Sequence, residues 1–99
     1  MRTVVVRYKV KPEKVEENQR LIEGVFVELH AKSPGGLQYL ALRLEDGSFV
    51  HLASMADNAP SLATFTAFQE FRRHADDRRL TAPESQRAMI IGNCLSSGR

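Results

Sequence analysis

His51 is the side chain in this sequence best suited to acid–base chemistry. It lies in the stretch FVHLASM, where its neighbours are mostly apolar. An imidazole titrates near neutral pH, so it could act as a general base or orient a ligand through a hydrogen bond. A polar group in apolar surroundings must also find a partner to offset its desolvation. His51 is therefore our candidate catalytic residue, and a hydrogen-bonded structural histidine is the alternative.

The other polar candidates lie close to His51 along the chain. Tyr39 and Arg43 share one face of a predicted strand, with Ser54 opposite Tyr39 on the next strand. They could hold an anionic ligand or pair across a subunit interface, and interfaces favour Tyr and Arg. We expect the interface role for Tyr39 and Arg43. Tyr8 could contact a ligand or pack as an ordinary strand residue.

Three phenylalanines recur at helical spacing in the second half of the chain, in the stretch FTAFQEF. An apolar stripe of this period usually faces the core, but it could also form the wall of a pocket for an aromatic ligand. The predicted ligand pocket consists of Tyr8, Leu42, Met55, Phe65, Phe68 and His74.

Several other chemistries are not indicated. The chain has three histidines and one cysteine, without zinc-ligand spacing, and no glycine-rich phosphate loop. No pattern of His and Asp partners marks Cys94 as a nucleophile, and we expect it to be a small buried residue. The stretch RRHADDRR mixes both charges and is typical of a solvated helix end rather than a nucleic-acid site. We expect no metal and no cofactor.

The composition indicates an ordinary globular protein. With 99 residues the chain is predicted to form a single domain over residues 1–99. The net charge of +2 is too small to indicate a nucleic acid or an anionic membrane as partner. A lone cysteine fits a reducing compartment, and no apolar run is long enough to span a bilayer. A cytoplasmic location is expected.

The stretch from Ser33 to Ala56 predicts a β-hairpin that positions His51. Asp46-Gly47 between two apolar runs is the pattern of a two-residue type I′ turn. This turn places Leu42 opposite His51 on one face. The other face then carries Tyr39, Ala41, Arg43, Val50 and Leu52.

The remaining elements are predicted from the spacing of apolar residues and from the proline and glycine residues that begin or end each element. A strand is predicted over residues 3–10 and a helix from Pro12 to Lys32, opened by proline and closed by Ser-Pro-Gly-Gly. A second helical region follows Asp57 and runs to about Arg79, and a last strand runs from Gln86 to Leu95. The order βαββαβ predicts an α+β, ferredoxin-like fold, with a four-stranded antiparallel sheet and two helices on one face.

Both faces of the predicted hairpin are largely apolar, whereas an antiparallel sheet with one wet face should alternate between apolar and polar residues. Two helices can cover only one face, so a second copy of the sheet is expected on the other. We predict a homodimer whose interface contains Tyr39, Ala41, Arg43, Val50 and Leu52.

The pattern also resembles a known family. VRYKVKPEKVEEN at the first strand and helix, SPGGLQYLAL, FVHLASM and the helix with AFQEF are similar to dimeric α+β barrel proteins of the antibiotic-biosynthesis-monooxygenase-like family. The resemblance implies a pocket between sheet and helices in each subunit. It also implies two classes of activity, since the family contains cofactor-free quinone-forming oxygenases and haem-degrading enzymes.

The sequence departs from the haem-degrading relatives. Those relatives place an Asn in the first strand, where this chain has Val6 and Arg7, and often a Trp at the end of the third strand, where it has Met55. His74 lies near the position of a recurrent haem ligand, but the Asn and the Trp are missing. We therefore expect no haem chemistry.

Three functions are compatible with this pattern. The first is a dimeric protein that binds a small apolar or aromatic ligand in a pocket between sheet and helices. The alternative, carried by the resemblance, is a cofactor-independent monooxygenase acting on a phenolic or polycyclic aromatic substrate. The third is a structural dimer without a ligand. A cavity beside His51 would distinguish the first two from the third.

Overall fold

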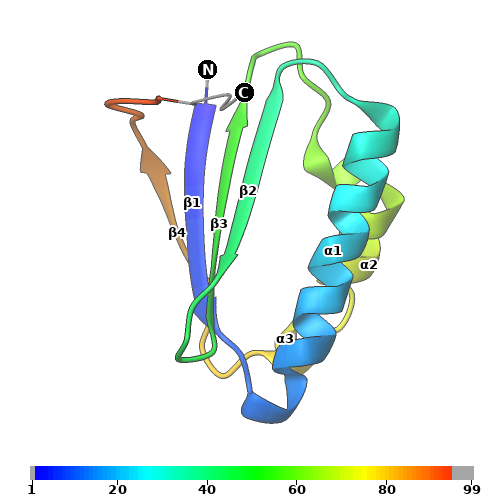
Figure 1. The fold of residues 1–99 in the computed structure, drawn as a ribbon, viewed down its shortest axis with the longest axis vertical. Coiled ribbons are helices and arrows are strands. Elements are labelled where there is room, and N and C mark those ends of the chain that lie inside the picture. The colour runs from blue at the N-terminus through cyan, green and yellow to red at the C-terminus, as the bar shows by residue number, and fades with distance from the viewer. Residues whose placement is uncertain (1, 95–99) are drawn as a thin grey trace.

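A computed structural model describes residues 2–94 and shows one antiparallel sheet with helices packed against it (Figure 1). The sheet has the strand order β2-β3-β1-β4, which is the ferredoxin-like order. The predicted βαββαβ arrangement is therefore confirmed. In chain order the elements are β1 (Arg2–Lys9), η1 (Pro12–Lys14), α1 (Val15–Lys32), β2 (Leu37–Arg43), β3 (Ser48–Met55), η2 (Leu62–Thr64), α2 (Thr66–Arg72), α3 (Ala75–Arg78) and β4 (Glu84–Ala88).

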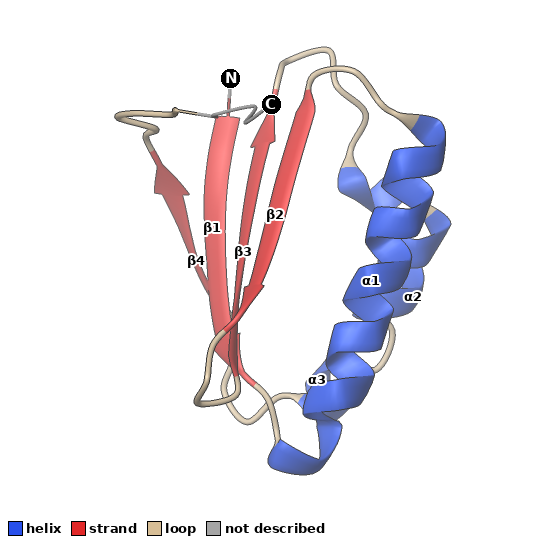
Figure 2. Cartoon of the chain, viewed as in Figure 1, coloured by secondary structure: helices blue, strands red, loops and turns tan. Residues whose placement is uncertain are grey.

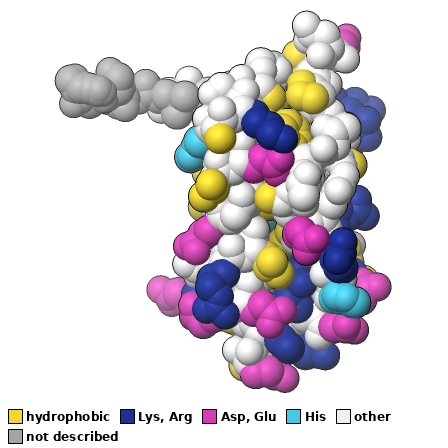
Figure 3. All heavy atoms as spheres, turned by 90° about the vertical axis from the view of Figure 1, so that its right-hand side faces the viewer, with side chains coloured by type: hydrophobic (Ala, Val, Ile, Leu, Met, Phe, Trp, Pro, Cys, Tyr) yellow, Lys and Arg dark blue, Asp and Glu magenta, His cyan; other side chains and the backbone are white. Residues whose placement is uncertain are grey.

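The helices of residues 2–94 all lie on one side of the sheet, and this part of the chain places no helix on the other side (Figure 2). The core fills the layer between sheet and helices. Its buried apolar residues are Tyr8, Val10, Val15, Ile22, Val25, Leu29, Phe49, Leu62, Phe65 and Phe71. Acidic and basic side chains are interspersed on the outward surface of the helices (Figure 3). Within residues 2–94 no helix is both long and apolar enough to cross a membrane.

α1 agrees with the predicted helix over Pro12 to Lys32, because its first turn is the 3-10 turn η1 with proline at its start. It ends at Ser33, which adopts a left-handed conformation with φ 44° and donates its backbone N–H to the carbonyl of Leu29. This arrangement closes the last turn of the helix by satisfying one of its terminal carbonyls.

The hairpin between β2 and β3 differs from its prediction by one residue. The N–H of Gly47 donates to the carbonyl of Leu44, and only Gly47 in this loop has a positive φ, of 87°. The loop therefore contains three residues, a type I turn followed by a left-handed glycine. The carboxylate of Asp46 accepts the N–H of Ser48 and holds this turn.

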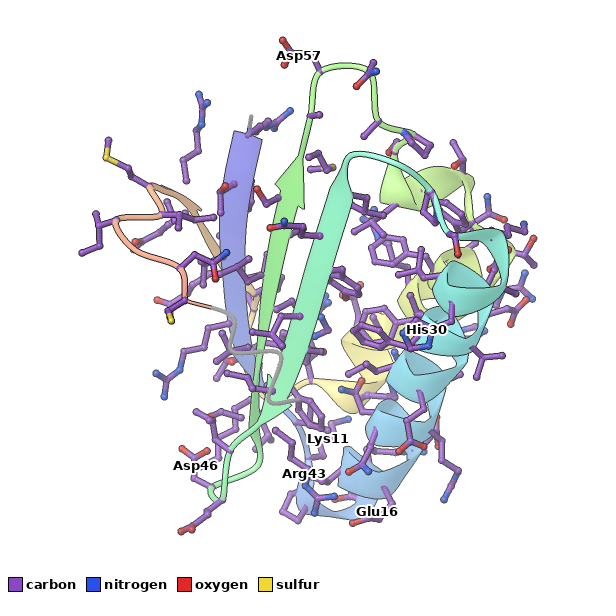
Figure 4. All side chains as sticks on the ribbon, turned by 45° about the horizontal axis from the view of Figure 1, so that its top comes forward. Lys11, Glu16, His30, Arg43, Asp46 and Asp57 are labelled. Atoms are coloured by element: carbon purple, nitrogen blue, oxygen red, sulfur yellow. The ribbon has the colours of Figure 1, made fainter. Side chains whose placement is uncertain are left out.

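The shifted register moves every β2 side chain to the opposite face. Ala41 now pairs with His51, and Leu42 pairs with Val50. Tyr39, Ala41 and Arg43 consequently face the helices rather than a partner subunit. Arg43 extends from β2 to Glu16 of α1, with a nitrogen–oxygen distance of 2.9 Å (Figure 4).

The second helical region is interrupted instead of continuing to Arg79. α2 ends at Arg72, and His74 adopts a left-handed conformation with φ 59° before the short α3 begins at Ala75. The break turns Arg78 back toward the end of α2. Its guanidinium donates to the carbonyl of Arg73 at 3.2 Å and to that of Phe71, so it caps carbonyls that have no partner within the helix.

β4 starts earlier and ends earlier than predicted. Its residue Ala88 pairs with Thr3, close to the start of β1, so the partner strand ends there. The apolar residues Met89 and Ile91 follow outside the strand and are exposed, at 84% and 94%. Cys94, expected to be buried, is exposed, and Leu95 lies outside the described residues.

Candidate functional site

His51 lies on the helix-facing side of β3 and is only 6% exposed. Both ring nitrogens contact a tyrosine hydroxyl: Nε2 lies 2.7 Å from Tyr8 Oη, and Nδ1 lies 2.6 Å from Tyr39 Oη. The strand register explains the cluster, because β1 and β2 flank β3 and present Tyr8 and Tyr39 on the face that carries His51. The three side chains form a continuous hydrogen-bonded group.

Aromatic contacts hold these rings in place. Tyr39 stacks on Phe26 of α1, with ring centroids 5.1 Å apart and planes at 11°. The ring of Tyr8 stacks on that of His51 at 5.4 Å, and Phe71 of α2 lies 5.5 Å from the imidazole. Stacked rings at these separations restrict one another's rotamers. The polar atoms are therefore positioned by packing on several sides.

The hydrogen-bonded group continues from Tyr8 into α1 and α3. Asn18 Nδ2 donates to Tyr8 Oη at 3.1 Å, and Arg78 Nε donates to Asn18 Oδ1 at 2.9 Å. Asn18 is 1% exposed and Arg78 is 2% exposed. The side chains of Tyr39, His51, Tyr8, Asn18 and Arg78 thus make one chain of hydrogen bonds, which we call the buried polar chain.

Burial shifts the protonation equilibria of this chain toward the neutral forms. It lowers the pKa of His51 from 6.5 to about 4. Burial raises the pKa of Tyr39, and the neighbouring Tyr8 adds to the effect. Burial also raises the pKa of Tyr8, against the lowering effect of its hydrogen bond from Asn18. At neutral pH the imidazole and both phenols are therefore uncharged.

A cavity of about 580 Å³ lies between the sheet and α2 beside this chain. Its polar lining comes from Tyr8, Asn18, Tyr39 and His51 and from Arg72, His74, Asp76, Arg79 and Ser85, and apolar residues from the sheet and the helices cover much of the rest. Ligand pockets in proteins commonly have this size and this combination of apolar walls with a few polar groups. The apolar part of the lining includes Val4, Val6, Ala53, Leu62, Phe68 and Phe71.

The predicted pocket residues divide between this cavity and other places. Tyr8, Phe68 and His74 line the cavity, although the side chain of His74 is largely exposed at its edge. Leu42 is on the opposite face of the sheet, 47% exposed, because of the shifted register. Phe65 is a core residue outside the cavity lining.

Met55 and most of the predicted interface residues also differ from their predicted placement. Met55 shares the face of His51 but does not line the cavity. Of the predicted interface residues, only Val50 and Leu52 lie on the face without helices, because the register turns Tyr39, Ala41 and Arg43 inward. Tyr39 thereby becomes a residue of the site.

Sequence reasoning missed Asn18 and Arg78. Asn18 carried a signal, since it interrupts the apolar stripe of α1 at a position that faces the core together with Val15, Ile22 and Val25. A buried amide at such a position needs a polar partner. Arg78 carried no comparable signal, because it is one of four arginines in RRHADDRR.

No cluster of three or more His, Cys, Asp or Glu side chains in residues 2–94 is arranged to bind a metal ion. Four of the polar side chains at the site, those of Tyr8, Tyr39, His51 and Asn18, are neutral at neutral pH. The site can therefore donate and accept hydrogen bonds to a ligand in a largely apolar cavity.

Comparisons with known proteins define the fold. The chain is similar to the structure of a candidate antibiotic biosynthesis monooxygenase from Nitrosomonas europaea, with a TM-score of 0.75 and 14% identity over 93% of this chain and 100% of that one. A protein of unknown function from the same organism matches with a TM-score of 0.71 and 15% identity, over 98% and 95% of the two chains. A conserved protein from Methanosarcina mazei Go1 matches with a TM-score of 0.69 and 18% identity, over 88% and 89%.

No protein-family model and no curated protein sequence matches the chain. The structural likeness nevertheless covers nearly the whole of each chain, so it identifies the fold. The chain has the α+β fold of the antibiotic-biosynthesis-monooxygenase-like proteins, as the resemblance in sequence implied. The site must be interpreted from its own residues, because one fold can carry many functions.

Proposed function

We propose that this protein binds a small, largely apolar aromatic molecule in the cavity beside His51. The observation that carries the proposal is the combination of about 580 Å³ of space, walls that are largely apolar and aromatic, and the buried hydrogen-bonded group made by Tyr39, His51 and Tyr8, with charged residues such as Arg72 and Asp76 also in the lining. A structural dimer without a ligand would be expected to fill this space with side chains, since protein interiors are close-packed.

Two adjacent valines of β1 provide a matched test. Val4 lines the cavity, whereas Val5 pairs with Leu52 on the opposite face. Val4→Phe should fill part of the cavity and abolish calorimetric binding of 2-acetylnaphthalene, a neutral two-ring ketone. Val5→Phe, the same change on the other face, should bind as the wild type does. Equal binding by both variants, or none by the wild type, would contradict the proposal.

The alternative is a cofactor-independent monooxygenase, and the name of one structural neighbour, a candidate antibiotic biosynthesis monooxygenase, supports a monooxygenase activity. It requires a base that removes a proton from a phenolic substrate. His51 is the only buried imidazole among the described residues, but both of its nitrogens are engaged by tyrosines and its pKa is about 4. A base this weak is poorly matched to proton removal at neutral pH. Ligand binding is therefore the function that the geometry favours.

Oxygen consumption separates the two functions. We expect no uptake above background when the wild type is mixed with a panel of hydroquinones. Uptake that saturates with substrate and disappears in Val4→Phe would instead support the oxygenase and give His51 a catalytic role.

We also propose that the chain forms a homodimer through the face of the sheet that carries no helix. Leu40 and Leu42 are 52% and 47% exposed on this face, next to the half-buried Val5, Val50 and Leu52. A continuous apolar surface of this kind is typical of subunit interfaces. Sedimentation equilibrium at micromolar concentration should show two chains per particle.

A further inference from the structure

The hydrogen bonds of the buried polar chain can all run from donor to acceptor in one sense, and Arg78 determines that sense. A guanidinium can only donate hydrogen bonds, so Arg78 Nε donates to Asn18 and the amide oxygen of Asn18 must face Arg78. The amide NH2 of Asn18 then faces Tyr8, and Nδ2 donates to Tyr8 Oη at 3.1 Å. Because Arg78 can act only as a donor, it fixes the orientation of the Asn18 amide.

Tyr8 continues the same direction. Its hydroxyl oxygen accepts from Asn18, so its own proton requires an acceptor. Among residues 2–94 its only other hydrogen-bond partner is His51 Nε2, at 2.7 Å. Tyr8 and Tyr39 both line the cavity, but Tyr8 is buried, at 6% exposed, whereas Tyr39 is only partly buried, so the Tyr8 O–H is the donor that more needs an acceptor within the protein. Tyr8 therefore donates to Nε2.

The imidazole of His51 is in turn the donor to Tyr39. Burial lowers the pKa of His51 to about 4, so the ring is neutral at pH 7 and carries one N–H. Since Nε2 accepts from Tyr8, the proton resides on Nδ1. Nδ1–H then donates to Tyr39 Oη at 2.6 Å. The hydroxyl proton of Tyr39 has no acceptor among residues 2–94, and Tyr39 lines the cavity.

We propose that Arg78 and Asn18 are positioning residues that hold His51 as its Nδ1–H tautomer, so that Tyr39 offers its hydroxyl proton to the cavity. The site then selects an aromatic ligand that carries a hydrogen-bond acceptor, such as a ketone, aldehyde or carboxylate oxygen, beside its apolar rings. This selection rests on the proposed function, whereas the direction of the chain does not depend on any ligand.

The charge of Arg78 reinforces the same selection. Its guanidinium is buried against Asn18 and the carbonyls of Phe71 and Arg73, and no carboxylate in the described part of the chain lies within ion-pair distance of it. A cation at the start of a chain of donors polarises each following hydrogen bond in the same sense. The Tyr39 hydroxyl at the other end is consequently a better donor than an isolated phenol.

The tautomer of His51 is directly measurable by 1H–15N correlation spectra of the ring nitrogens in histidine-labelled protein. His30→Gln and His74→Asn, at exposed positions, remove the other two imidazoles and leave the signals of His51, and asparagine tolerates the left-handed conformation of residue 74. We expect a protonated Nδ1 and an unprotonated Nε2 at pH 7. A protonated Nε2 would overturn the proposal without any variant of the buried chain.

Asn18→Asp should reverse the chain while keeping its shape. The carboxylate still accepts from Arg78, but it cannot donate to Tyr8, so Tyr8 should turn its proton to the carboxylate. His51 would then donate from Nε2 to Tyr8 and accept from Tyr39 at Nδ1. A switch to the Nε2–H tautomer supports the positioning role of Asn18, and an unchanged tautomer contradicts it.

Ligand pairs complete the test. 2-Acetylnaphthalene carries a carbonyl acceptor, and 2-ethylnaphthalene has a similar shape without it. The wild type should prefer the ketone by about three- to tenfold, the value of one net hydrogen bond, and Asn18→Asp should lose this preference. Equal binding of both ligands by the wild type would overturn the selection but not the cavity. If the wild type bound neither ligand, this would contradict both the proposed function and the ligand selection. The tautomer of His51 would still report the direction of the hydrogen bonds in the buried polar chain.

Discussion

Each face of the sheet carries side chains that are unusual for its surroundings. The face toward the helices carries the hydrogen-bonded His51, Tyr8 and Tyr39, whereas the face without helices carries exposed Leu40 and Leu42. A solvent-facing sheet surface would normally be polar and the covered one apolar. Burying polar groups is unfavourable unless they are satisfied, and exposing leucines is unfavourable unless they are covered. The comparison supports the proposed ligand site on the first face and the proposed subunit interface on the second.

The largest effect is expected on the face without helices. Leu52→Glu places a carboxylate in the proposed interface, where a charge without a partner costs about 3–5 kcal/mol. The dimer dissociation constant should rise by roughly a hundredfold to several thousandfold. Val27→Glu is the control, because Val27 is 70% exposed on α1. Sedimentation equilibrium should show a monomer for the first variant and a dimer for the second, and a wild type that is already monomeric would refute the interface.

A somewhat smaller effect is expected from His51→Leu on the helix-facing side. The leucine fills similar space but leaves the hydroxyls of Tyr8 and Tyr39 without the imidazole, and each buried donor or acceptor left unpaired costs about 1–3 kcal/mol. The free energy of unfolding should fall by about 3 kcal/mol in urea titrations at fixed protein concentration. Val50→Leu, on the opposite face of β3, should change it much less. An unchanged or higher stability for His51→Leu would show that the imidazole serves only packing.

The pH dependence of stability tests the same face without a mutation. His51 has a pKa of about 4 in the folded protein, below the 6.5 of an unperturbed imidazole. As the pH falls below 6.5, the unfolded chain binds a proton that the folded chain does not. Stability is therefore lost between pH 6.5 and about pH 4, by roughly 2–3 kcal/mol in total. Urea titrations of His51→Phe should lack this part of the loss, and an identical pH profile for both proteins would contradict the lowered pKa.

The smallest effect is expected from Tyr39→Phe. The change removes one hydroxyl at the edge of the cavity and should lower stability by only about 1 kcal/mol. Affinity for 2-acetylnaphthalene should fall about three- to tenfold, whereas affinity for 2-ethylnaphthalene should stay unchanged. Calorimetry with the two ligands measures both, and a parallel loss for both would show that Tyr39 contributes shape and not a hydrogen bond.

The sequence was sufficient for the order of the elements and for the placement of His51 toward the helices. It was not sufficient for the register, because Asp46-Gly47 fits a two-residue turn and a three-residue turn with a left-handed glycine almost equally well. The difference is one residue, and it decides whether Tyr39 belongs to the site or to the interface. The acceptor role of the Asp46 carboxylate toward Ser48 favours the longer loop in the folded chain.

The end of the chain shows a second limit. The run Met89-Ile90-Ile91 has strand character by composition, but a strand also requires a partner, and β1 begins at Arg2, next to the Thr3 that pairs with Ala88. Local propensity could not reveal this, since pairing is a tertiary property. Similarly, Arg78 enters the site only because the chain turns at His74, which no periodicity indicated.

The most direct test of the account is a methyl NMR titration of the wild type with 2-acetylnaphthalene. Val4, Val5 and Val6 follow one another in β1 and alternate between the two faces of the sheet. Binding in the cavity should shift the methyl signals of Val4 and Val6 and leave those of Val5 and Leu52 in place. Shifts centred on Val5 and Leu52, or no shifts at a saturating ligand concentration, would contradict the claim that the helix-facing side is the ligand site.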